Sequence, residues 1–171
     1  MTTAALVDPE RQFLGCLMQQ PASEAGRLVD GLGPGDFADP MCAWVFALAL
    51  GVLGDGRAPS PVALLEHARD TTNTAARTGG ADLLARLGGW LVDTYRDTPH
   101  ANPEHGTWLK TVVLKQAWRR AVAEHTTRVL QATEQCPTNE LRRLHTDTAH
   151  TERLWRRYHA ATHPTTITEA A

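Results

Sequence analysis

The chain has 171 residues, of which 42% are hydrophobic and 21% are charged, and its formal net charge at pH 7 is −2. This length allows a buried core in one domain with or without an appendage, and the small net charge gives no global argument for nucleic-acid or membrane partners. The two halves differ. Residues 1–102 carry 7 Lys/Arg against 12 Asp/Glu, whereas residues 103–163 carry 10 against 6. The basic half predicts an anionic partner, or contact with the acidic half of a neighbouring copy.

The three cysteines are far apart in the sequence and include no Cys-x-x-Cys pair. Cys16 and Cys42 stand among apolar residues, where a free cysteine usually behaves as a small buried hydrophobe. The stretch Met1–Leu6 lacks the basic and apolar regions of a signal peptide. We therefore expect a protein of the reducing cytoplasm without membrane association.

The first predicted helices are set off by proline and cap signals. Asp8-Pro9 is a helix start, and this helix ends before Pro21; Ser23 is expected to cap a second helix that reaches Leu32. The third helix, Pro40–Leu53, contains no charged residue and is apolar on all sides. Such a helix is either buried or spans a membrane, and at about 21 Å it is too short for a span. We predict the central helix of a helical core.

Two further helices complete the predicted globular head, residues 1–102, which holds about five to six helices. Ser60-Pro61 repeats the cap-and-proline signal of a helix start. The polar stretch Asp70–Gly80 predicts a flexible loop, and Ala81–Val92 resumes a helix with leucines on one face. A turn is expected around Pro99. No segment has the pattern of a strand, so the predicted fold class is all-α.

Residues 103–163 predict a long antiparallel helical hairpin. Asn102-Pro103 caps a helix that continues to about Gln135, and a second helix extends from about residue 139 to 161. The connection is so short that the two helices should lie side by side. Residues 164–171 form a Thr-rich tail, which we expect to be flexible.

Apolar residues recur along both hairpin helices at spacings of three and four, as in a diluted coiled-coil seam. A hairpin cannot cover all its own apolar surface, so Leu130, Leu154, Trp155 and Tyr158 call for a partner. That partner is either the globular head or a second copy of the chain, and a second copy is the more economical choice. The candidate interface residues are Trp118, Val122, Val129, Leu141, Leu144, Trp155 and Tyr158.

Pairs of arginines accompany this seam and form the candidate basic contacts. They are Arg119, Arg120, Arg142, Arg143, Arg156 and Arg157. They could touch nucleic-acid phosphates, but interleaved glutamates such as Glu124 and Glu152 weaken any stripe of one sign. A solvated face or an acidic protein partner is the usual outcome. We therefore expect direct nucleic-acid binding to be absent or weak, and a small DNA- or RNA-binding regulator is the alternative function.

No catalytic, cofactor or metal site is predicted. The sequence contains no GxxxxGK[ST], GxSxG, HExxH or EF-hand pattern. His159 and His163 are four residues apart, yet no cysteine or paired acid completes a tetrahedral metal set. We expect a protein that binds other molecules and is not an enzyme.

The order of several short motifs resembles the N-terminal domain of DnaB-type replicative helicases. They are Glu10-x-x-Phe13-Leu14-Gly15-Cys16-Leu17-Met18, Asp36-Phe37-x-x-Pro40, Val45-Phe46 with Leu50, Gly56 with Leu64, Gly79-Gly80 before Leu83-Leu84-x-x-Leu87, then Pro99, Asn102 and Trp108-x-x-x-Val112-x-x-Lys115-x-x-x-Arg119-Arg120. Ala38 and Cys42 depart from it, because the family often has an aromatic residue and a histidine there.

The resemblance implies a non-enzymatic module made of a helical globule and a hairpin. Such a module pairs with another copy, helps to order a helicase ring and docks primase. The chain ends near the position where the linker and ATPase domain of the family would begin, so the motor is not expected. The predicted partners are thus a second copy and primase or a full-length replicative helicase.

Overall fold

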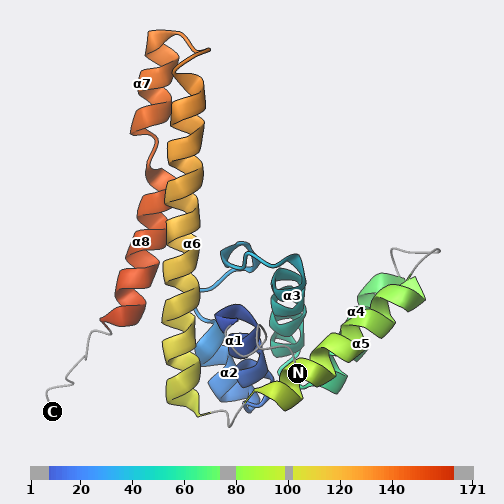
Figure 1. Ribbon diagram of the computed structural model, residues 1–171. Coiled ribbons are helices and arrows are strands. Elements are labelled where there is room, and N and C mark those ends of the chain that lie inside the picture. Colours follow the sequence, from blue (N-terminus) through green and yellow to red (C-terminus); the bar gives the residue numbers. More distant parts are fainter. Residues whose placement is uncertain (1–7, 74–79, 99–101, 164–171) are drawn as a thin grey trace, which may run out of the picture. The chain divides into compact units, whose positions relative to one another are not determined.

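The computed structural model describes residues 8–73, 80–98 and 102–163 (Figure 1). These residues form eight α-helices and one 3-10 turn and contain no strand, so the all-α prediction is confirmed. The elements are α1 (Pro9–Met18), α2 (Ala22–Val29), η2 (Pro34–Asp36), α3 (Pro40–Gly54), α4 (Pro61–Asn73), α5 (Gly80–Asp97), α6 (Pro103–Ala132), α7 (Thr138–Thr146) and α8 (Ala149–Thr162). The predictions for the leader, the turn at Pro99 and the tail from 164 lie outside the described residues.

The chain divides into two compact units, Met1–Lys110 and Thr111–Ala171, and α6 begins in the first and continues in the second. Several helix starts follow the expected cap chemistry. The carboxylate of Asp8 accepts hydrogen bonds from the backbone N–H groups of Glu10 and Arg11 at 3.0 and 3.3 Å. Asp39 accepts one from Met41 at 2.7 Å. Each bond satisfies an N–H group that the helix itself leaves unpaired.

Some predicted boundaries of the first unit are wrong. Ser23 does not cap α2: this helix starts at Ala22 behind Pro21 and ends at Val29, short of Leu32. The loop predicted for Asp70–Gly80 is shorter, since α4 continues to Asn73 and α5 begins at Gly80; residues 74–79 lie outside the described part. The hydroxyl of Thr71 donates to the carbonyl of His67 at 2.9 Å, so this polar residue stays inside the helix.

The core of the first unit lies where α1 and α3 meet. Residues 13–18 of α1 are all buried, and α3 packs with α1, α2 and α4. Three phenylalanine rings form its centre: the centroids of Phe37 and Phe46 are 4.8 Å apart, and Phe13 lies 6.2 and 6.4 Å from them. Side chains on only part of α3 are buried, and Ala47 is exposed. The central helix is thus a core element that is open on one side.

Cys16 and Cys42 are buried in this core, as predicted. Burial raises the pKa of the Cys16 thiol to about 11. The pKa of Cys42 is raised further, by burial first and then by the nearby Asp39 carboxylate. Both thiols are therefore protonated at neutral pH, where only a thiolate is strongly reactive.

Two glycines allow close helix packing in the first unit. A Cβ atom on Gly15 of α1 would lie 1.8 Å from the hydroxyl of Thr98, at the end of α5. A Cβ atom on Gly51 of α3 would lie 2.2 Å from Nε2 of His67 in α4. At Gly15 the neighbouring atoms include the Thr94 backbone, so this glycine sets the distance between α1 and α5, whereas at Gly51 the imidazole of His67 would have to move.

In the second unit, α7 and α8 return along α6 and form the predicted hairpin (Figure 1). The return segment is not one helix, as the sequence suggested, because it breaks at Asp147 and Thr148. The hydroxyl of Thr146 donates to the carbonyls of Arg142 and Arg143, both at 3.1 Å. Thr and Asp have low helix propensity, and such side-chain bonds compete with the helical backbone, so the Thr-Asp-Thr stretch ends α7.

The hairpin core is small. Its buried cluster consists of Ala117, Ala121 and Leu154, with Trp118 packed against it. Leu154 was expected to need an outside partner, but it is only 5% exposed because the alanines of α6 let α8 come close. None of the described helices is both long and apolar enough to cross a membrane.

Candidate interaction surface

Aromatic rings from both sides of the hairpin come together next to this core. The ring centroids of Trp118 on α6 and Trp155 on α8 are 4.9 Å apart. From Trp155 the contacts continue to Tyr158 at 5.7 Å and to His159 at 5.8 Å, and His159 lies 4.5 Å from His163. We call these five residues the aromatic ladder. The Trp118–Trp155 pair joins the two helices and fixes the register of α8 against α6, because aromatic rings at this distance attract one another.

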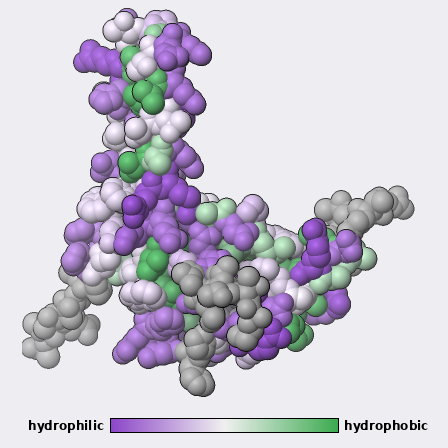
Figure 2. All heavy atoms as spheres, viewed as in Figure 1, coloured by the Kyte–Doolittle hydropathy of each residue, from purple (hydrophilic) through white to green (hydrophobic). Residues whose placement is uncertain are grey.

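The predicted interface residues differ in exposure. Trp118, Val129, Leu141, Leu144 and Tyr158 are half-buried within the hairpin. Val122 and Trp155 are 38% and 39% exposed, and Leu130 is 68% exposed. Figure 2 accordingly shows single hydrophobic residues among hydrophilic ones on the visible face of the hairpin. The side chains free to meet a partner are therefore Val122, Leu130 and Trp155.

The candidate basic residues form two groups. The contact between the two tryptophans brings Arg119 and Arg120 of α6 to the same level as Arg156 and Arg157 of α8. Arg142 and Arg143 belong instead to α7, a helix with no buried residue. Arg119, Arg142, Arg143 and Arg156 are exposed, whereas Arg120 and Arg157 are half-buried.

The candidate residues chosen from the sequence did not include Lys115, which lies on the same helix as Arg119, and no stacking role was predicted for His159. Lys115 precedes Trp118 by three residues and Arg119 by four, spacings that put all three on neighbouring faces of a helix. His159 follows Trp155 by four residues and stacks against it. The three- and four-residue spacings of these residues were visible in the sequence. A seam defined by apolar residues alone does not include a lysine or a histidine.

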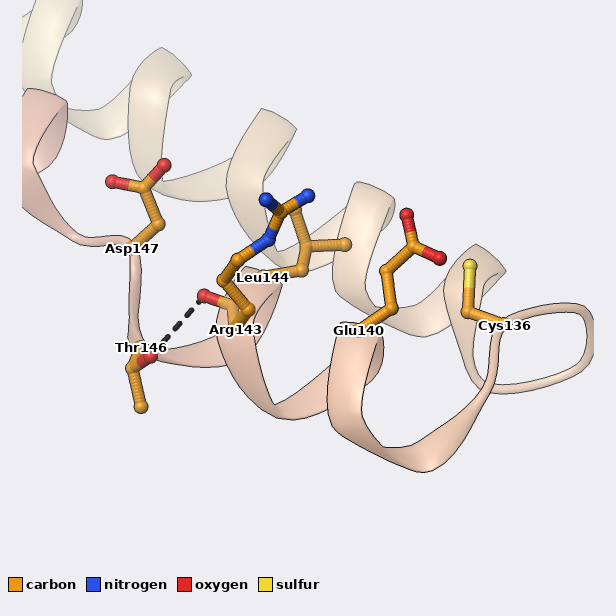
Figure 3. Close-up of a pocket in the computed structure, with 6 residues that line it drawn as sticks. All are labelled: Cys136, Glu140, Arg143, Leu144, Thr146 and Asp147. Atoms are coloured by element: carbon orange, nitrogen blue, oxygen red, sulfur yellow. Dashed lines mark hydrogen bonds between the residues drawn. The ribbon is translucent and has the colours of Figure 1, made fainter.

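A pocket of about 520 Å³ lies at the tip of the hairpin (Figure 3). Its lining residues are Cys136, Glu140, Arg143, Leu144, Thr146 and Asp147. Four of these residues belong to α7, and Asp147 lies at the break that follows it. Figure 3 shows the guanidinium of Arg143 lying over Leu144, between the carboxylates of Glu140 and Asp147.

Several arginines of the first unit form ion pairs, whereas two cations of the hairpin do not. In the first unit arginines pair with nearby acids on the same helix, as Arg27 does with Glu24 at 3.0 Å and Arg96 with Asp93 at 2.9 Å. Lys115 and Arg119 on the hairpin have no ion pair within the described residues. In residues 8–73, 80–98 and 102–163 no three His, Cys, Asp or Glu side chains gather as a metal site would require.

Two compact helical units, the second with exposed aromatic and cationic side chains, define an all-α module. The sequence matches the family model of the DnaB-like helicase N terminal domain over residues 3–101, more than half of the chain. The chain therefore belongs to the DnaB-like helicase N-terminal domain family, and the resemblance seen in its motifs is confirmed.

The fold agrees with a solved member of that family. It is similar to the crystal structure of the N-terminal domain of DnaB helicase from Mycobacterium tuberculosis, with a TM-score of 0.61 and 19% sequence identity. That match covers 91% of this chain and 94% of the other. No curated protein matches the sequence significantly.

Proposed function

We propose that this protein is a non-catalytic replication module that associates with a second copy through its hairpin and docks a replication protein. The observation that carries the proposal is the exposed apolar surface at Val122, Leu130 and Trp155, on a chain of the DnaB-like helicase N-terminal domain family. The exposed part of a tryptophan and two aliphatic side chains offers a few kcal/mol of burial, at about 25 cal/mol per Å². This exposed apolar area is a useful anchor for an interface, because it is the part of these side chains that does not pack within the hairpin.

The proposed docking partners are a full-length replicative helicase or primase, and the proposed compartment is the cytoplasm. The family to which the chain belongs supports a replicative partner.

A pull-down from the native cytoplasm, scored for helicase and primase, tests the docking proposal. The wild-type chain is expected to capture at least one of the two. Changing Leu130 to Asp places a charge on the exposed hairpin surface and should reduce capture about tenfold or more, because a buried unpaired charge costs several kcal/mol.

Val92→Asp is the matched control, since Val92 is also an exposed branched aliphatic residue, 58% exposed, but lies on α5. It should capture as well as the wild type. Capture of neither protein by the wild type, or equal capture by the Leu130 variant, contradicts docking through the hairpin.

A further inference from the structure

We propose that the flank of the hairpin around Trp155 binds single-stranded nucleic acid. This goes beyond the proposed association and docking. The flank consists of the exposed rings Trp155 and His159 on α8 and His163 just after it, and of three exposed cations, Lys115 and Arg119 on α6 and Arg156 on α8. The Trp118–Trp155 contact joins the two helices at this level.

The rings are spaced for successive stacking contacts. Trp155 and His159 are four residues apart, which is about 6 Å along a helix, and His163 follows four residues later at the C-cap of α8. Their centroid distances of 5.8 and 4.5 Å show a continuous row, and all three are exposed. Bases stack on such side chains without regard to sequence, because every base has a π-face.

Cations border this row on both helices. Lys115 and Arg119 are one helical turn apart and lack ion pairs within the described residues, so their charges are available to an outside anion. The Nε–H group of Arg156 donates to the backbone carbonyl of Glu152 at 3.4 Å, which leaves its charge uncompensated by a carboxylate.

Acidic side chains are scarce at this level of the hairpin. Residues 111–123 and helix α8 together contain six cations and one carboxylate, that of Glu152. Of the glutamates interleaved with the cations in the sequence, Glu124 follows this stretch of α6 directly, whereas Glu134 and Glu140 lie beyond the end of α6 and in α7. The hairpin therefore concentrates the positive charge beside the rings, which linear order does not reveal.

A single strand of nucleic acid can contact both the cations and the aromatic rings of this flank. Its phosphates can meet the cations while its unpaired bases meet the rings. An acidic protein segment would neutralise the cations and leave the rings without stacking partners. A duplex keeps its bases inside, so it would also leave the rings unused.

The test measures the fluorescence anisotropy of a labelled oligothymidine and of an RNA of equal length. We expect binding at low salt, with a slope of log K against log[salt] of about −2, since three phosphate contacts contribute about −0.7 each. The combined change Lys115→Ala, Arg119→Ala and Arg156→Ala should remove most of this slope. The control is Arg128→Ala, Arg142→Ala and Arg143→Ala, which removes the same charge from exposed residues outside the flank and should keep the slope.

Stacking is tested by Trp155→Leu and, because Trp155 also supports the hairpin, by the exposed His159→Leu. Each should weaken binding about 5- to 150-fold at constant helix content, as expected for the loss of one stacked base. Three results would overturn the proposal. These are no binding at low salt, equal losses in the two triple variants, and displacement of the strand by polyglutamate as efficient as by unlabelled strand, which would show an acidic protein partner.

The two proposals share the Trp155 ring, which can face a second copy or a base but not both at once, and the charge variants separate them. The flank triple variant retains Val122, Leu130 and Trp155, so it should still associate with a second copy even when it no longer binds nucleic acid. Loss of association in the wild type would remove the proposed function and leave the anisotropy result unaffected.

Discussion

Replacing Gly15 with alanine is expected to destabilise the first unit by about 1–2 kcal/mol. The new methyl carbon would lie 1.8 Å from Oγ1 and 2.7 Å from Cβ of Thr98, and 3.0 Å from the carbonyl oxygen of Thr94. Two of these atoms belong to a short side chain and one to the backbone, so α1 and α5 must separate. Overpacking of this kind costs about 1–3 kcal/mol or more, which exceeds the ~1 kcal/mol that alanine gains over glycine in a helix.

Thermal unfolding followed by circular dichroism measures this effect. For a chain of this size the melting temperature should fall by about 2–8 °C. Gly26→Ala is the matched control, because Gly26 also lies inside a helix but a Cβ there meets nothing within 4 Å. That variant should be as stable as the wild type or more stable by up to about 1 kcal/mol. A Gly15 variant that melts with the wild type would contradict the packing described for α1 and α5.

Replacing Glu10 with alanine is expected to cost about 2–3 kcal/mol. The side chain is 5% exposed, and its two carboxylate oxygens accept hydrogen bonds from the backbone N–H of Ala38 at 2.8 and 2.9 Å and from that of Asp39 at 3.1 Å. These bonds hold the start of α3 against α1. Hydrogen bonds to a charged group contribute about 1.5–3 kcal/mol, and their loss leaves donors without a partner.

Glu10→Gln should lose about half as much, since its amide oxygen still accepts while its NH₂ group faces a donor. The control is Glu66→Ala, which removes an exposed acid paired with Arg69 on the same helix. Exposed pairs are worth less than about 1 kcal/mol, so this change should hardly move the urea midpoint. Equal midpoint shifts for Glu10→Ala and Glu66→Ala would show that the carboxylate bonds to Ala38 and Asp39 do not stabilise the unit.

The sequence predicted the fold class and several helix starts because those depend on local signals. Asp8 and Asp39 cap their helices as expected, and burial of Cys16 and Cys42 follows from their apolar neighbours. The motif that begins at Glu10 pointed to the right family but gave no reason for the glutamate. That reason is a contact between residues 28 positions apart, which no local pattern contains.

The break in the hairpin shows why other features could not be predicted. A seam drawn at spacings of three and four treats Thr148 as one more position in a continuous helix. In the structure the hydroxyl bond of Thr146 and the geometry of Asp147 end α7 there. The pocket at the tip is lined by Asp147 at this break together with residues of α7, and the cationic flank depends on the register set by Trp118 and Trp155, so neither feature follows from a local pattern.

The central proposal is that two copies of the chain associate through the exposed side of the hairpin. The direct test is to measure the mass of the wild-type chain and of two tryptophan variants by light scattering. At concentrations up to about 100 µM, dimerisation with a Kd in the micromolar range would be detected. Trp155→Asp places a charge on the hairpin surface, and Trp108→Asp is the control, because Trp108 is even more exposed, at 56%, but belongs to the first unit.

The wild type and Trp108→Asp are expected to reach at least twice the chain mass of 18.7 kDa, whereas Trp155→Asp remains near it. Val122→Asp should behave like Trp155→Asp and shows that loss of the ring contact with Trp118 is not the cause. A wild-type chain that stays at 18.7 kDa over the whole range would contradict the account.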